Sequence, residues 1–112
     1  MNRALENDSA EFPLVELDDL LQHRARIAAA VLLARHDRLS FSRLKALLNE
    51  TDGNLGAQLR KLEDAGYVKA LKEFQDRRPV TWYELTTKGK RALTLHLANL
   101  ERLIRRARGK RE

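Results

Sequence analysis

Two glycines stand near the start of a segment that otherwise has the pattern of an amphipathic helix, TDGNLGAQLRKLEDAG. A glycine inside a helix costs about 1 kcal/mol relative to alanine. At about 100° per residue, one side of this helix carries Leu55, Leu59 and Leu62. The opposite side carries Gly53, Ala57, Arg60 and Lys61. Small residues therefore lie where the helix could approach another surface closely.

This arrangement fits the major groove of double-stranded DNA. Asn54 and Gln58 lie along one flank of the helix, and each amide carries the donor and acceptor that meet an adenine edge. Arg60 or Lys61 could reach phosphate or guanine, and the helix N-terminus attracts phosphate. The alternative is that Gly53 and Gly56 only ease a tight turn, while the polar side chains are solvated.

A second basic feature lies between two strand-like segments, YVKALKEF and VTWYEL. The sequence QDRRP between them predicts a hairpin loop over residues 75–79, at the tip of a wing over residues 74–80. Arg77 and Arg78 at its tip could enter a minor groove or clamp phosphates, with Lys72 along the ribbon. The alternative is an ordinary soluble loop, because acidic residues lie nearby. On the second strand we expect Trp82, rather than Tyr83, to be buried.

The remaining pattern predicts the elements that position these residues. A long first helix begins near Asp18, Ser40 or Ser42 can cap a short helix after it, and residues 39–40 could add a short strand. A second short helix over residues 52–65 follows a tight turn and stops at Gly66. A long last helix follows Thr86 or Thr87. The expected fold is mainly α with a small β-hairpin, a winged helix-turn-helix.

The chain resembles the small winged-helix transcriptional regulators related to the MarR and ArsR groups. The resemblance is carried by TDGNL, LRKLEDAGYV, RRPVTWYELT and TKG, and it covers residues 17–104. It implies sequence-specific, usually dimeric DNA binding that controls transcription. The predicted DNA contacts are Thr51, Asn54, Ala57, Gln58, Arg60, Lys61, Lys72, Arg77 and Arg78.

The first and last helices offer more leucine surface than so small a domain is expected to bury. We therefore predict that both helices form a homodimer interface. The alternative is that the apolar stripe of leucines on the last helix simply covers its own domain. The predicted interface residues are Leu17, Leu20, Leu21, Leu93, Leu97, Leu100 and Ile104. Residues 17–106 form the predicted domain, after a flexible arm at 1–16 and before a flexible basic tail at 107–112. The tail could hold flanking DNA or be solvated.

Composition narrows the other function classes. The net charge of +6 favours nucleic acid as a partner, and the absence of cysteine removes thiolate chemistry. Three histidines lack metal-ligand spacing, and no nucleophile and base are grouped, so we expect no metal, no cofactor and no enzyme. Without a signal peptide or long apolar run, the protein is expected to be cytoplasmic and not membrane-bound. A protein-interaction module and a sensor of an unidentified small-molecule effector remain the alternatives.

Overall fold

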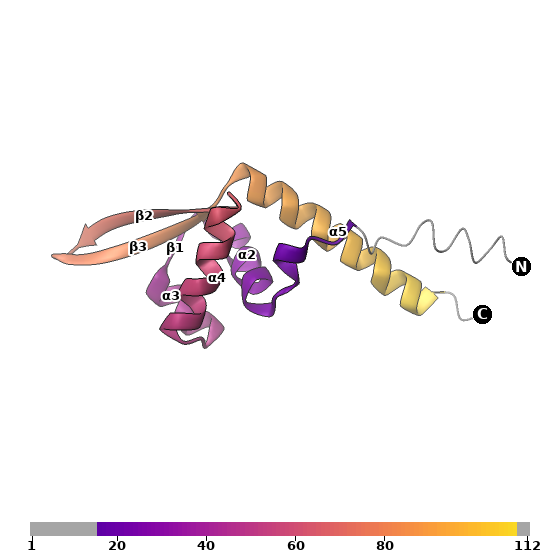
Figure 1. Cartoon of the computed structure of the whole chain (residues 1–112), viewed down its shortest axis with the longest axis horizontal. Coiled ribbons are helices and arrows are strands. Elements are labelled where there is room, and N and C mark those ends of the chain that lie inside the picture. Colours follow the sequence, from indigo (N-terminus) through magenta and orange to yellow (C-terminus); the bar gives the residue numbers. More distant parts are fainter. Residues whose placement is uncertain (1–15, 110–112) are drawn as a thin grey trace, which may run out of the picture.

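The computed structural model describes residues 16–109, which form a small helical domain with a protruding hairpin and a long last helix (Figure 1). The predicted winged helix-turn-helix is confirmed. Its elements are, in chain order, η2 (Asp19–Gln22), α2 (Arg24–Arg35), β1 (Leu39–Ser40), α3 (Phe41–Leu48), α4 (Asp52–Asp64), β2 (Val68–Gln75), β3 (Arg78–Leu85) and α5 (Thr87–Gly109).

The prediction of a single long first helix is wrong, because the segment is divided at His23 into η2 and α2. The Asp18 carboxylate accepts a hydrogen bond from the Leu20 N–H at 2.9 Å and caps the 3-10 helix η2. His23 then has an extended backbone, and its Nδ1 accepts from the Ala25 N–H at 3.1 Å. Two caps five residues apart therefore start two helices instead of one.

Side-chain caps also define the helix-turn-helix. Ser40 Oγ accepts from the Arg43 N–H at 3.1 Å at the start of α3, which ends at Asn49 in the left-handed conformation. Thr51 Oγ1 accepts from the Asn54 N–H at 3.1 Å and starts α4. Gly66, with a φ of 81°, ends α4 as predicted. The tight turn therefore fixes α4 directly after α3.

The sheet has three antiparallel strands in the order β1-β3-β2. The pairing of β2 with β3 continues to Gln75 opposite Arg78, so only Asp76 and Arg77 form the turn. Both turn residues have positive φ, 52° and 66°, as in the type I′ turns that match strand twist. The loop predicted over residues 75–79 is therefore reduced to a two-residue turn, and the arginines lie at the end of a regular ribbon.

The core lies between the helices and the base of the sheet. The leucines predicted for the inner side of α4 are buried. The other buried residues of this core are Leu21, Ala29, Ala30, Leu33, Leu39, Leu44, Val68, Leu85 and Leu93. Trp82 and Tyr83 are both partly buried, but Tyr83 packs against this cluster and Trp82 does not, so the core position predicted for Trp82 is taken by Tyr83. Trp82 instead carries the Arg38 guanidinium 4.1 Å from its ring centre.

The junction between β3 and α5 is closely packed. Thr86 accepts a hydrogen bond from the Gly89 N–H at 3.0 Å, and its hydroxyl donates to the Gly66 carbonyl at 2.6 Å. Gly89 is buried against the Tyr67 carbonyl oxygen, where a Cβ atom would collide with the backbone. From this junction α5 continues to Gly109, three residues past the boundary predicted for the domain.

We predict that Gly89→Ala lowers the free energy of unfolding by about 1 to 3 kcal/mol, because the new methyl group overpacks a backbone contact. Gly56→Ala is the matched control, since nothing lies within 4 Å of its added Cβ. It should instead raise stability by about 0.5 to 1 kcal/mol through helix propensity. Urea unfolding followed by circular dichroism measures both changes. Equal midpoints for the two variants would contradict the close packing at Gly89.

Candidate nucleic-acid interface

The exposed side of α4 carries small residues and two basic side chains. Gly53 and Ala57 are exposed, and an added Cβ at Gly53 would meet no atom within 4 Å. Arg60 and Lys61 are also exposed on this side, opposite the buried leucines. The fold itself therefore does not require a glycine at position 53. What the missing side chain provides is a surface on which another molecule can lie close to the helix backbone.

The flank of α4 differs from the sequence expectation. Gln58 is only 8% exposed, and its side-chain oxygen accepts from Arg26 Nη1 at 2.5 Å. Gln58 Nε2 donates to Asn54 Oδ1 at 3.2 Å, and Asn54 Nδ2 donates to a Glu50 carboxylate oxygen at 2.7 Å. Asn54 remains partly exposed. This placement argues against direct base contact by Gln58 and leaves Asn54 as the amide that faces outward.

The start of α4 combines the helix cap with an ion pair. Thr51 is exposed but its hydroxyl oxygen accepts the Asn54 N–H, so its main role here is the cap. Lys45 Nζ lies 2.9 Å from the Asp52 carboxylate, which moderates the acidic charge beside the helix N-terminus. Lys45 of α3 is thus held beside the first residue of α4.

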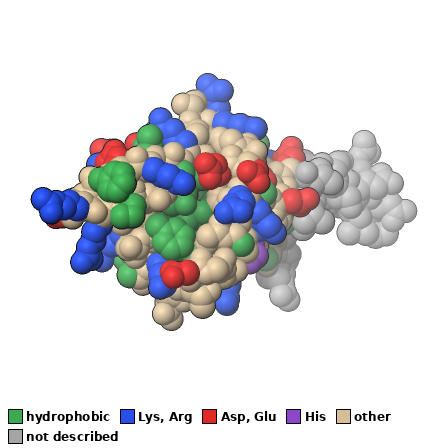
Figure 2. Space-filling view, turned by 60° about the vertical axis from the view of Figure 1, so that its left-hand side comes forward, with side chains coloured by type: hydrophobic (Ala, Val, Ile, Leu, Met, Phe, Trp, Pro, Cys, Tyr) green, Lys and Arg blue, Asp and Glu red, His purple; other side chains and the backbone are tan. Residues whose placement is uncertain are grey.

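The hairpin places its arginines at one end of the molecule. Arg77, Arg78 and Lys72 are all exposed, and Figure 2 shows Lys and Arg side chains at the end where Figure 1 places the turn. Glu73, a nearby acidic residue, is 3.1 Å from Arg38 Nη1. Its charge is therefore partly compensated from the base of the ribbon, and it opposes the terminal arginines less than the sequence indicated.

Sequence reasoning missed one feature of the wing. Phe74 is 79% exposed and lies opposite Pro79, two residues before the turn begins. Strand alternation places its side chain on the same face of the ribbon as Lys72. Scattered exposed apolar residues are common on protein surfaces, so Phe74 by itself assigns no contact.

Tyr83 lies where the wing meets α3. Its ring centre lies 6.5 Å from that of Phe41. Burial, with the charge of Glu63, raises the pKa of the Tyr83 hydroxyl, while Arg60 lowers it. The net upward direction means that Tyr83 stays a neutral phenol at physiological pH and can donate a hydrogen bond beside the basic side of α4.

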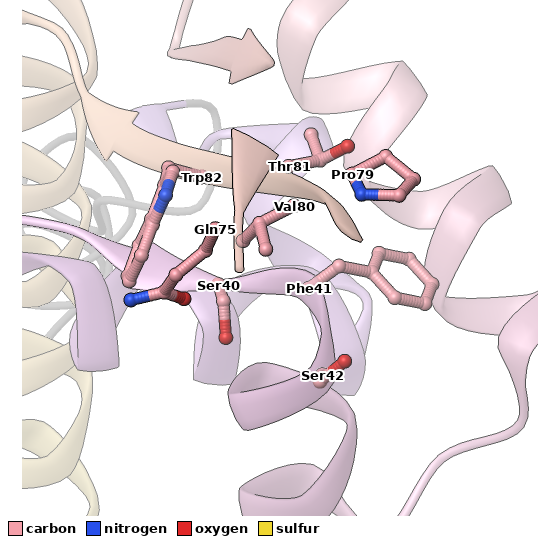
Figure 3. A pocket seen from close by; sticks show the side chains of 8 residues that line it. All are labelled: Ser40, Phe41, Ser42, Gln75, Pro79, Val80, Thr81 and Trp82. Atoms are coloured by element: carbon pink, nitrogen blue, oxygen red, sulfur yellow. The ribbon is translucent and has the colours of Figure 1, made fainter. Parts of the chain in front are cut away.

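An open cleft of 380 Å³ lies between the start of α3 and the outer edge of the wing. Figure 3 shows the rings of Phe41 and Pro79 on one side of this cleft and those of Trp82, with the Gln75 amide, on the other. The remaining lining residues are Ser40, Ser42, Val80 and Thr81. The lining residues carry hydroxyl and amide groups but no charged side chain, so the cleft offers hydrogen bonds and apolar contact to a ligand.

The predicted dimer residues divide into three sets by their exposure. Leu21 and Leu93 are buried in the core of their own chain, so their assignment to an interface with a second chain is corrected. Leu97 and Ile104 are 42% and 49% exposed. The other three, Leu17, Leu20 and Leu100, are partly buried. Only part of the predicted stripe is therefore available for contact between chains.

Polar contacts hold the start of the described chain on α5. The Asp18 N–H donates to His96 Nδ1 at 3.0 Å, and Asn99 Nδ2 donates to the Glu16 carbonyl at 3.3 Å. His96 and Asn99 are both buried.

The arm predicted at 1–16 and the end of the basic tail lie almost wholly outside the described residues. Within residues 16–109, no helix has the length and apolarity to cross a membrane, and no cluster of potential metal ligands occurs.

Comparisons with known proteins agree with this architecture. The family described as "Winged helix DNA-binding domain" matches residues 25–104. An uncharacterized protein of Methanocaldococcus jannaschii is 35% identical over 78 residues, which cover 70% of this chain and 85% of that protein.

Solved structures share the fold. A transcriptional regulator homologue from Pyrococcus horikoshii has a TM-score of 0.80 at 28% identity, over 88% of this chain and 98% of that chain. A MarR family transcriptional regulator from Streptomyces coelicolor, solved in complex with DNA, has a TM-score of 0.68 at 22% identity, over 98% and 75%. The matched family, the order of the elements and the hairpin together show that the chain belongs to the winged helix DNA-binding domain family.

Proposed function

We propose that this chain is a homodimeric transcriptional regulator that recognises specific double-stranded DNA. The observation that carries the proposal is the outer side of α4, where Gly53 and Ala57 leave the backbone open between exposed Arg60 and Lys61. Such a surface can enter a major groove closely enough for a flanking amide to reach base edges. The MarR family regulator of known structure in complex with DNA supports this reading by its shared fold.

The wing supplies the second part of the proposed interface. Its two-residue turn carries Arg77, followed at once by Arg78, with exposed Lys72 behind them. Guanidinium groups on a narrow ribbon can enter a minor groove or bind the phosphates that border it. In the proposed complex, α4 reads sequence in one groove while the wing supplies affinity beside it.

The first experiment is selection of bound duplexes from a random DNA pool at near-physiological salt, with the mass of the complex measured in parallel. We expect an inverted repeat bound by two chains, with half-sites about one helical turn apart. A scrambled duplex that binds as well as the selected one would overturn the sequence-specific function. Failure to bind any duplex at low salt would instead favour a protein-interaction module.

For the wing, we predict that replacing Arg77 and Arg78 by alanine weakens binding to every duplex about equally. The dependence of log affinity on log salt should become shallower by about 0.9 for each phosphate contact removed. The matched control replaces Arg105 and Arg108 by alanine. These changes remove the same charge from the end of α5, at the opposite end of the molecule (Figure 1). An equal loss of affinity in the control would contradict a specific role of the wing, because net charge or contacts of the basic tail would then account for the effect.

For the dimer, we predict that Leu97→Glu combined with Ile104→Glu yields a monomer with unchanged helix content. Both side chains are exposed in the single chain, so the new carboxylates oppose only association between chains. Leu95→Glu is the control, because Leu95 is 59% exposed and lies almost opposite Leu97 around α5. Sedimentation equilibrium distinguishes the states. A double variant that keeps its dimer mass would show that the stripe is not the interface.

A further inference from the structure

A continuous chain of hydrogen bonds connects α2 to the flank of the proposed recognition helix. It begins at Arg26, whose Nε donates to the Leu20 carbonyl at 2.6 Å and whose Nη1 donates to Gln58 at 2.5 Å. It continues from Gln58 Nε2 to Asn54 Oδ1 at 3.2 Å and from Asn54 Nδ2 to Glu50 at 2.7 Å. Three segments of the chain, η2, α2 and α4 with its preceding turn, thus meet in one network.

The two ends of this chain have fixed chemical polarity. A guanidinium can only donate, so the atom of Gln58 that faces Arg26 must be its oxygen. An ionised carboxylate can only accept, so the atom of Asn54 that faces Glu50 must be its nitrogen. Between these ends, Gln58 nitrogen meets Asn54 oxygen. Reversal of either amide would place donor against donor or acceptor against acceptor, so Arg26 and Glu50 together set the orientation of both amides.

This orientation leaves useful groups on Asn54. One N–H of its amide is bonded to Glu50, and one lone pair of its oxygen accepts from Gln58. One further N–H and one further lone pair therefore remain on a side chain that is partly exposed beside Gly53. A donor and an acceptor on one amide are the groups that pair with N7 and N6 of adenine in the major groove.

We propose that Arg26 is a positioning residue for sequence readout. It does not touch DNA but holds Gln58, and through Gln58 it orients Asn54 to read an adenine. This inference rests on the proposed DNA-binding function and adds to it a residue that determines specificity from the inner side of α4. Gln58, predicted from sequence as a base contact, becomes the link between the positioning arginine and the reading amide.

The test measures base preference at every position of the selected duplex for the wild type, Arg26→Met, Asn54→Ala and the double variant. Asn54→Ala should lower the preference at one base pair about tenfold. Arg26→Met should lower the preference at that same base pair by about threefold or more, with little effect on the slope of affinity against salt. In the Asn54→Ala background, Arg26→Met should cause no further loss, because its effect passes through Asn54.

Two further variants separate positioning from folding and from charge. Arg24→Met removes the same charge from an exposed arginine of the same helix and should leave the base preference unchanged. Gln58→Glu keeps an acceptor for Arg26 but offers Asn54 no donor. Asn54 then lies between two carboxylates, so neither orientation of its amide is held, and the preference at its base pair should fall while circular dichroism shows a folded protein.

The outcomes distinguish this inference from the function on which it rests. If the wild type selects no sequence, the proposed function itself fails. If the wild type is specific but Arg26→Met weakens all duplexes equally, or its effect adds fully to that of Asn54→Ala, Arg26 does not position the reading amide. Gln58→Glu with an unchanged base preference would overturn the assignment in the same way.

Discussion

The burial of three leucines on the inner side of α4 determines how the rest of this molecule can act. Leu55, Leu59 and Leu62 are almost fully removed from solvent, so α4 cannot rotate about its axis without exposing them. That constraint fixes which residues face outward. The glycine at position 53 lies on the outward side, where an added Cβ would meet no atom within 4 Å. Its small size is therefore available for the approach of a partner.

Polar contacts refine what the leucines determine. A hydrophobic stripe sets the rotation of a helix but does not decide which way a side-chain amide points. In this chain the orientation of the Gln58 and Asn54 amides is set by Arg26 and Glu50, the charged groups at the two ends of a hydrogen-bond network. Arg26 also bonds the carbonyl of Leu20, in a segment that His96 holds on α5 through the Asp18 N–H. The proposed reading amide is thus oriented by contacts that reach from three helices.

Local sequence signals predicted most of the fold. The leucine spacing of α4, the stop at Gly66 and the short strand at residues 39–40 needed only periodicity and turn chemistry, and all three are present. The division at His23 was missed because helical spacing continues across it, whereas two side-chain caps interrupt the backbone. Alternation showed that Trp82 and Tyr83 face opposite ways, but their assignment depends on the packing of the sheet against the helices.

The candidate site was less predictable, since its contacts join distant segments. Helical projection placed Gln58 on the flank of α4 but could not show that Arg26, 32 residues away, would bond it. An arginine on a partly buried helix face was the available signal, and it does not specify a partner. In the same way, the leucine stripe of α5 did not separate Leu93, which its own domain buries, from Leu97.

The shape of α5 gives the physical reason for proposing a second chain. Its first half covers the domain, where Leu93 and His96 are buried. Its second half extends beyond the domain, as Figure 1 shows, and leaves Ile104 about half exposed. Apolar side chains on a projecting helix stabilise the protein only when another surface covers them and removes them from water. Two copies that bury this segment together would also set the separation of their α4 helices, so association and the spacing of DNA half-sites would depend on the same contact.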